Sequence, residues 1–313
     1  MKDLLRTASL TPDDLTYLLD LAAEQKADPH RHPNLLRGDV VALYFAKPST
    51  RTRFSFEAAV HRLGGSAVTV GPSDLQLGRG ETIEDTARTI SHFARAFVIR
   101  TFAHGDIRCF ADAASIPVIN ALTDLHHPCQ SLADLLTLRE RFGSLRDLRI
   151  AYVGDGDNVA HSLMEGVALA GGHISLGCPA GYEPSPEILA KASEIAAGTG
   201  GSVTLCSDPW EAVAGAEAVY TDVWLSMGND ASEREERHAK LAPYQVNEVL
   251  LDRATPGAIF MHCLPAHRGD EVTADVMDGP RSVVFDQVEN RAHTEQAVLI
   301  ALLERRLRGT GVL

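Results

Sequence analysis

Residues 49–53, Ser-Thr-Arg-Thr-Arg, combine hydroxyl groups and arginines in a pattern suited to binding an anion. They follow an apolar run at 40–45, and apolar side chains recur at helical spacing over 51–63. The first N–H groups of a helix lack partners within it, and the helix dipole is positive there. The guanidinium groups of Arg51 and Arg53 match phosphate or carboxylate oxygens. The pattern predicts a site for a phosphate-like group; the alternative is an N-capped helix with solvated arginines.

Polar side chains at the ends of two later elements extend this prediction. Arg100 ends an apolar run at 96–99, and a charge at the end of a parallel strand lies where α/β sheets bind ligands. His127 and Gln130 stand at the entry of a predicted helix, where His can donate to a carbonyl oxygen and Gln can donate and accept. The alternatives are an arginine paired at the rim of the sheet and a histidine that caps the helix.

A glycine-containing turn in the second half of the chain does not fit the pattern of a dinucleotide-binding site. The sequence Gly-Asp-Gly-Asp-Asn at 154–158 follows a predicted strand, but Val159 replaces the third glycine of the dinucleotide fingerprint. The next strand also ends in Cys178 rather than in an acidic residue. Asn158 is therefore expected either to bond a polar substrate or to cap its helix.

Three further side chains lie at the ends of elements in the second half. Asp222 follows a predicted strand, where a carboxylate can pair with a substrate amine or cap a turn, and the loop at 225–229 could act as a lid. Cys263 lacks a second cysteine or a base–orienter pair, and no metal ligands at suitable spacing accompany His262, so a non-covalent, metal-free role is favoured. Arg291 is expected just before the last helix, facing an interdomain cleft.

The elements that position these residues alternate between strand and helix, which predicts an α/β fold with two parallel-sheet domains. A break at 143–147 separates domains at 1–142 and 143–293, and the C-terminal helix, within 294–313, is expected to pack back on the first domain. The predicted strands are 39–45, 66–70, 96–99, 117–120, 149–155, 173–178, 202–206, 217–221 and one starting at 259. The predicted helices are 9–27, 51–63, 82–93, 106–114, 132–141, 158–170, 185–197, 209–214, a charged and solvated helix at 233–241, and 294–308.

Composition excludes several functional classes. The 313 residues carry a formal net charge of −13, which argues against a nucleic-acid partner. No apolar run reaches the roughly 20 residues of a membrane span, and the first residues lack an apolar signal core. Five scattered cysteines indicate a reducing cytoplasm. An anionic substrate therefore needs a local cationic pocket, such as clustered arginines within a Debye length of about 8–10 Å.

The order of these motifs resembles that of the ornithine branch of the aspartate/ornithine carbamoyltransferase family over essentially the whole chain. Two motifs are shared with the aspartate branch: Ser-Thr-Arg-Thr-Arg at 49–53 and His-Pro-Cys-Gln at 127–130. Three motifs resemble the ornithine branch: Asp-Val-Trp at 222–224, Ser-Met-Gly at 226–228 and His-Cys-Leu-Pro at 262–265. The closing motif is Glu-Asn-Arg-Ala-His at 289–293.

The resemblance implies transfer of the carbamoyl group of carbamoyl phosphate to L-ornithine, giving L-citrulline and phosphate in arginine biosynthesis, without a cofactor or metal. It implies a carbamoyl-phosphate-binding first domain, an ornithine-binding second domain, and a homotrimer or a multiple of trimers. The alternatives are another amine, such as putrescine or an acylated ornithine, and a non-catalytic module with the same fold. Asp157 and Thr101 depart from the family pattern, which often has Asn and Gly there.

The resemblance also assigns roles residue by residue. Gln76 lies in the polar loop 71–81, which in the family reaches toward the neighbouring subunit. The implied catalytic residues are Arg51, Arg100, His127, Asp222 and Cys263. The implied carbamoyl-phosphate ligands are Ser49, Thr50, Arg51, Thr52, Gln76, Arg100, His127, Gln130, Cys263, Leu264 and Arg291. The implied ornithine ligands are Asn158, Asp222, Ser226 and Met227.

Overall fold

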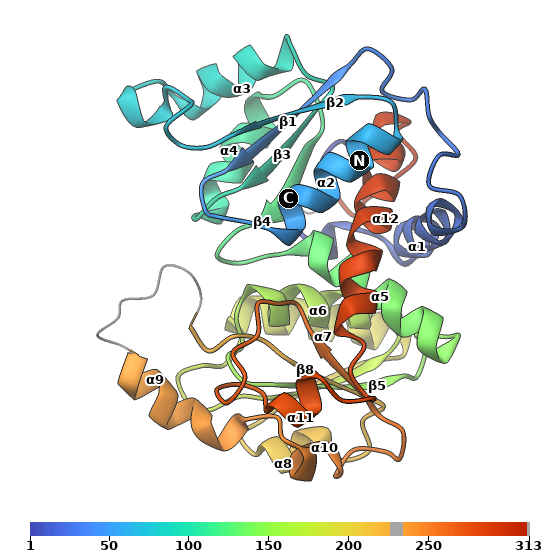
Figure 1. Ribbon diagram of the computed structural model, residues 1–313, viewed down its shortest axis with the longest axis vertical. Coiled ribbons are helices and arrows are strands. Elements are labelled where there is room, and N and C mark those ends of the chain that lie inside the picture. Colours follow the sequence, from blue (N-terminus) through green and yellow to red (C-terminus); the bar gives the residue numbers. More distant parts are fainter. Residues whose placement is uncertain (226–233, 312–313) are drawn as a thin grey trace. The chain divides into compact units, whose positions relative to one another are not determined.

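The computed structural model describes residues 1–225 and 234–311 (Figure 1). It divides into two compact units: Met1–Leu136 with Glu289–Leu313, and Thr137–Val288. Each unit is built on its own parallel β-sheet, which confirms the predicted pair of α/β domains. The two units are described separately below and are called the first and second unit.

The first unit contains a four-stranded sheet in the order β2-β1-β3-β4, with every pair parallel. Because β1 is flanked by β2 and β3, the carboxyl end of β1 is where parallel α/β sheets most often bind ligands. In the register, Phe45 at the end of β1 pairs with Arg100 at the end of β3. The strands are β1 (Val40–Phe45), β2 (Ser66–Val70), β3 (Ala96–Arg100) and β4 (Val118–Leu122).

Helices cover this sheet on both sides (Figure 1). Phe97 and Ile99 pack with Ile107 and Phe110 into a core cluster that joins the sheet to α3 and α4. The helix after β1 lies on the opposite side, with Phe56 fully buried. The helical elements are η1 (Thr7–Ser9), α1 (Pro12–Ala27), α2 (Arg51–Arg62), η2 (Leu77–Arg79), α3 (Ile83–Ser91), α4 (His104–Ala113) and α5 (Pro128–Phe142).

The second unit contains a five-stranded parallel sheet in the order β7-β6-β5-β8-β9. Its strand order reverses between β5 and β8, so the ends of β5, β8 and β9 form the expected ligand-binding edge. Thr221 at the end of β8 pairs with His262 at the end of β9. The strands are β5 (Arg149–Val153), β6 (His173–Gly177), β7 (Ser202–Cys206), β8 (Ala218–Thr221) and β9 (Ile259–His262).

The helices of the second unit also form two groups. One group packs over Ala151, Val219 and Phe260 in a core cluster that includes Val213 of α8 and Leu250 of α10. The other group is the pair α6 and α7. The elements are α6 (Asn158–Leu169), α7 (Pro186–Thr199), α8 (Pro209–Val213), α9 (Arg234–Leu241), η4 (Ala242–Tyr244), α10 (Glu248–Leu251) and α11 (Ala274–Met277).

The last helix, α12, spans Val284–Leu303 and differs from the helix predicted at 294–308. Its first half is rich in polar residues and shows no apolar helical periodicity, so the predicted helix began later in the sequence. Gln287 and Asn290 are nevertheless almost completely buried, so polar side chains occupy core positions of this helix. From Glu289 onward the helix belongs to the first unit, where Lys26 of α1 donates to Asn290 and pairs with Glu289.

None of the helices in the described ranges combines the length and apolar character needed to cross a membrane.

Candidate active site

The start of α2 differs from the starts of α1 and α3 in how its N-cap hydroxyl is used. Thr50 is the N-cap residue, but within the described ranges its side chain makes no capping hydrogen bond. The hydroxyls of Thr11 and Thr82, by contrast, each accept a 3.1 Å bond from a backbone N–H in the first turn of α1 and α3. The Thr50 hydroxyl is therefore not committed to its own helix, and the first N–H groups of α2 can meet an anion.

The two arginines of this segment have different surroundings. Arg53 is 53% exposed, and its Nε donates to Glu57 Oε1 over 2.9 Å along the surface of α2. Arg51 is half-buried and close enough to His127 for its charge to lower the pKa of that imidazole. The solvated-arginine alternative thus describes Arg53, whereas Arg51 is half-buried and lies near His127.

Positive charges surround His127, which is buried immediately before α5. Burial, followed by the charges of Arg291, Arg100 and Arg51, holds the pKa of His127 well below its ordinary value. The imidazole is therefore neutral at physiological pH, with one nitrogen that donates and one that accepts. Three arginines from β3, α2 and α12 thus meet around a neutral histidine in the first unit.

Arg291 lies within α12 rather than just before it, which corrects the position expected from the sequence. Its Nη1 donates to Gln130 Oε1 over 2.6 Å, and its Nη2 donates to Thr52 Oγ1 over 2.9 Å. Gln130 Nε2 donates in turn to Asp134 Oδ1 over 2.8 Å. All four side chains are buried, so this network fixes the orientation of the Gln130 amide.

A second cluster forms at the sheet edge of the second unit, around Asp222. Asp222 directly follows β8, and its Oδ1 accepts from Cys263 Sγ over 2.8 Å and from the backbone N–H of Val223 over 2.7 Å. Burial raises the pKa of Asp222, and the nearby His262 is the main opposing influence. The half-buried Cys263 therefore acts as a hydrogen-bond donor to a buried carboxyl group.

Two more carboxyl groups lie near Asp222, after β5. Burial, together with the charges of Asp222 and Asp155, raises the pKa of Asp157 well above its ordinary value. Asp157 is also the N-cap residue of α6, where its Oδ1 accepts from Val159 N over 3.1 Å, so Asn158 is the first residue of that helix and not its cap. A site with several carboxyl groups suits a cationic amine.

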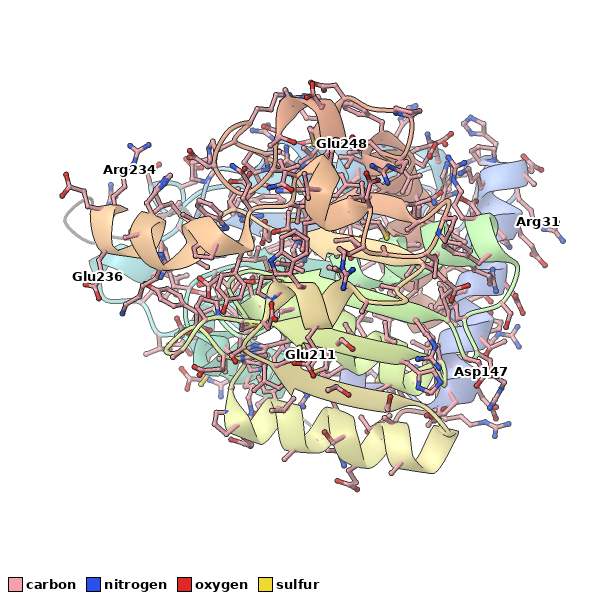
Figure 2. The ribbon with its side chains drawn as sticks, turned by 90° about the horizontal axis from the view of Figure 1, so that it is seen from below. Arg31, Asp147, Glu211, Arg234, Glu236 and Glu248 are labelled. Carbon is pink, nitrogen blue, oxygen red and sulfur yellow. The ribbon has the colours of Figure 1, made fainter. Side chains whose placement is uncertain are left out.

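Arg237 of α9 pairs with Asp155, one of the carboxyl groups near Asp222. It forms an ion pair with Asp155, and its Nε donates to the carbonyl oxygen of Trp224 over 2.8 Å. The prediction of a solvated α9 holds for Arg234 and Glu236, whose labelled side chains project outward in Figure 2. Arg237 is only 13% exposed, and the sequence did not reveal its role.

The loop after β9 orients the imidazole ring of His262. Leu264 has a φ of 61°, and its backbone N–H donates to His262 Nδ1 over 2.8 Å. His262 Nε2 lies 3.4 Å from Glu271 Oε1. Ligand atoms of Asp222, His262 and Cys263 lie within 4.8 Å of one another, as in a possible cation site. His262 Nδ1 and the Cys263 thiol, however, already make the hydrogen bonds described above.

Gln76 does not belong to either cluster, and two further predicted ligands cannot be placed. Gln76 is exposed before η2, and no hydrogen bond in the described part of the chain joins its side chain to another site residue. Ser226 and Met227 lie outside the described residues. Asp134, Glu271 and Glu295 contact site residues but were not predicted, because a buried carboxylate within a helix or loop carries no distinctive local motif.

Both halves of the chain match models of one protein family. Residues 2–140 match the model described as "Aspartate/ornithine carbamoyltransferase, carbamoyl-P binding domain". Residues 146–302 match the model described as "Aspartate/ornithine carbamoyltransferase, Asp/Orn binding domain". The two matches together cover nearly all of the chain and both of the clusters described above.

Individual relatives agree with this family. The chain is 51% identical to the ornithine carbamoyltransferase of Symbiobacterium thermophilum over 304 residues, covering 96% of this chain and 98% of that protein. It is 51% identical to the Bacillus subtilis ornithine carbamoyltransferase over 302 residues, covering 96% and 94%. The solved ornithine carbamoyltransferase of Pyrococcus furiosus superposes with a TM-score of 0.92 at 48% identity, covering 96% of each chain. The chain therefore belongs to the aspartate/ornithine carbamoyltransferase family.

Proposed function

We propose that the protein transfers the carbamoyl group of carbamoyl phosphate to the δ-amine of L-ornithine, which yields L-citrulline and phosphate. The observation that carries this proposal is the buried, neutral His127 with the charges of Arg51, Arg100 and Arg291 around it. Such a site suits a small substrate that combines a carbonyl group with a phosphate. The identity to ornithine carbamoyltransferases along the whole chain supports ornithine as the acceptor.

The first unit holds carbamoyl phosphate in this proposal. The start of α2 supplies hydroxyl and N–H groups to the phosphate from Ser49, Thr50 and Thr52, with the guanidinium of Arg51 beside them. Donors from Arg100, His127 and Gln130 polarise the carbonyl group and stabilise the oxyanion that develops as the amine attacks. Preorganised donors of this kind stabilise the transition state more than the ground state, which is the source of the rate enhancement.

The second unit holds the amine. Asp222 pairs with an amino group of the substrate and, with the Cys263 thiol bonded to it, orients the acceptor. The attacking δ-amine must be neutral, so proton loss precedes or accompanies attack. The remaining contacts to ornithine come from Asn158, Ser226 and Met227. Contacts to the carbamoyl group of carbamoyl phosphate come from Cys263 and Leu264. These roles follow the family resemblance.

The proposal includes a cellular role and an assembly, which the family resemblance supports. The protein works in arginine biosynthesis in the cytoplasm and forms a homotrimer or a multiple of trimers. Gln76, which is exposed on its loop, serves a neighbouring subunit and completes that subunit's carbamoyl-phosphate site. Mixing a Gln76→Ala variant with an Arg51→Ala variant tests this arrangement, because shared sites predict partial recovery of activity in mixed oligomers.

The reaction itself is tested by following a label. The purified protein is incubated with ¹³C-carbamoyl phosphate and L-ornithine, and the products are read by ¹³C and ³¹P NMR. The expected result is label in the ureido carbon of citrulline, with one phosphate released for each labelled citrulline. Phosphate release without labelled citrulline, or no turnover at all, would contradict the proposal.

A further inference from the structure

Glu295 is a buried carboxyl group one helical turn beyond Arg291 on α12. Its side chain is completely inaccessible to solvent, and Arg291 is 2% exposed. Glu295 Oε1 accepts two hydrogen bonds from Arg291, one from Nε over 3.2 Å and one from Nη2 over 2.8 Å. One carboxylate oxygen therefore contacts the side of the guanidinium group and restricts its rotation.

The opposite edge of the same guanidinium group reaches the carbamoyl-phosphate site. Nη1 donates to Gln130, and the Nη2 that contacts Glu295 also donates to Thr52. Arg291 thus connects three helices of the first unit, α2, α5 and α12, through a single planar group. Because the guanidinium is rigid, fixing one edge also fixes the direction of the donors on the other edge.

We propose that Glu295 is a positioning residue for carbamoyl phosphate: it fixes the plane of Arg291, and Arg291 in turn holds Gln130 and Thr52 in the orientation that the substrate requires. This inference rests on the proposed function, because Gln130 and Thr52 bind carbamoyl phosphate only if that function is right. Glu295 itself touches no substrate in this scheme. Its effect is indirect and passes through Arg291.

The groups around Glu295 define what a neutral replacement would do. Glu295 faces Arg291 on its own helix and Ser55 of α2, and Cys129 and Asp134 of α5 lie near Arg291. Burial, opposed mainly by Arg291, raises the pKa of Glu295 to about 7. The neutral acid is therefore a normal form of this side chain near pH 7. Gln, which has the same shape and an acceptor oxygen, should then position Arg291 nearly as well as Glu.

Three variants separate positioning from a general effect on the fold. Glu295→Leu removes the acceptor, Glu295→Gln keeps it, and Gln296→Leu is the matched control. Gln296 is the next residue of α12 and equally buried, but its amide donates to Gln25 of α1 and to the carbonyl oxygen of Pro29, which follows α1. Each variant is checked by thermal unfolding, and KM for carbamoyl phosphate, KM for ornithine and kcat are then measured below the unfolding range.

For Glu295→Leu we expect KM for carbamoyl phosphate to rise by about tenfold or more, the effect of releasing hydrogen bonds that order charged ligands, with KM for ornithine changed less than about twofold. Glu295→Gln should stay within about threefold of the wild type in both constants. Gln296→Leu should lower the unfolding temperature without changing KM. The selective change in one KM and its rescue by Gln are effects that a purely structural role would not produce.

A folded Glu295→Leu protein with a wild-type KM for carbamoyl phosphate would overturn the inference. If that variant does not fold, Glu295→Asp decides the matter, since it keeps the carboxyl group but retracts it by one methylene group. An unchanged KM for carbamoyl phosphate in Glu295→Asp would also overturn the inference. A wild-type protein that makes no citrulline would instead refute the proposed function, so the two failures are distinguishable.

Discussion

Arg291 donates a 2.6 Å hydrogen bond to Gln130, a residue that precedes it by 161 positions in the sequence. The same guanidinium group reaches Thr52, which is 239 positions away. The first unit is therefore not assembled by the N-terminal part of the chain alone. Its candidate carbamoyl-phosphate site requires a side chain from the C-terminal helix.

Replacing Arg291 by Lys tests this dependence. A single ammonium group cannot serve Gln130, Thr52 and Glu295 in one plane, so buried acceptors lose their donors. We expect the free energy of unfolding to fall by about 2 kcal/mol and kcat/KM for carbamoyl phosphate to fall by at least about tenfold. Urea unfolding and steady-state kinetics measure the two effects. The control is Arg306→Lys, an exposed arginine paired with Glu304, which should change neither quantity.

The pair Arg51→Ala and Arg53→Ala tests which arginine of the 49–53 segment faces the phosphate. Arg51→Ala should cost at least about 2–3 kcal/mol of transition-state stabilisation, because a charged contact to the phosphate is lost. Arg53→Ala should cost less than about 0.5 kcal/mol, since it removes only a surface pair with Glu57. The measurement is kcat/KM for each variant. Near-wild-type kcat/KM in Arg51→Ala, or equal losses in both variants, would contradict the assignment.

Cys263 is expected to act as a donor to Asp222 and not as a nucleophile. Cys263→Ala removes this 2.8 Å hydrogen bond and should lower kcat/KM by roughly tenfold, about 1.4 kcal/mol, without abolishing turnover. Cys263→Ser keeps a donor and should retain more activity than Ala. A citrulline assay ranks the variants, and mass spectrometry looks for an adduct. Complete loss of activity together with a trapped covalent adduct would refute this role.

The Asp14 side chain predicts a stability that depends on pH. Its carboxylate accepts from the backbone N–H groups of Arg308 and Gly309, each over 2.8 Å, and from Thr11 in a capping box. Burial alone would raise the pKa of Asp14, but these N–H groups outweigh it and lower the pKa. The stabilisation is thus present above the unfolded pKa, about 3.9, and is lost as the pH falls through the folded value.

Asp14→Asn should therefore lower the free energy of unfolding by about 1–2 kcal/mol at pH 7, and by progressively less as the pH falls below about 4. The matched control is Asp13→Asn, because Asp13 lies in the same first turn of α1 but is 84% exposed. Urea unfolding at several pH values gives the comparison. A loss at pH 7 no larger than that of Asp13→Asn would contradict the prediction.

Glu295 should make stability depend on pH in the direction opposite to that of Asp14. Its pKa in the folded protein, raised by burial to about 7, exceeds the unfolded value of about 4.3. Its contribution to stability is then complete below the unfolded pKa and is lost as the pH rises through 7. The free energy of unfolding of the wild type should therefore fall between pH 5 and pH 8. In Glu295→Gln, which has no ionisable group at this position, the fall should be smaller by on the order of 2 kcal/mol. Equal pH dependence in the two proteins, measured by urea unfolding, would contradict this.

The sheets could be predicted because their signal is local. Apolar, β-branched runs bounded by turns gave the strand at 202–206 with the residues observed for β7, and the strand at 96–99 within one residue of β3. The first half of α12 could not be predicted in the same way. Gln287, Asn290 and Arg291 are buried with hydrogen-bond partners, so the helix shows no apolar periodicity there.

The candidate sites show the same limit. The 49–53 and 127–130 motifs are contiguous and follow strands, so their chemistry can be read from the sequence. The pairing of Arg237 with Asp155, and of Glu295 with Arg291, depends on the tertiary structure or on burial. A charged residue in a polar helix is usually solvated, and only the structure distinguishes Arg237 from its exposed neighbours.

The most direct test of the account is the dependence of kcat/KM on the acceptor amine, at saturating carbamoyl phosphate. The panel contains L-ornithine, putrescine, N-acetyl-L-ornithine and L-aspartate, with the carbamoylated product of each amine quantified. We expect kcat/KM for L-ornithine to exceed that for every other amine by at least about 100-fold. N-acetyl-L-ornithine blocks the amino group that pairs with Asp222, L-aspartate has no second amino group, and putrescine lacks the carboxylate of the amino acid. An equal or higher kcat/KM with any other amine would contradict the account.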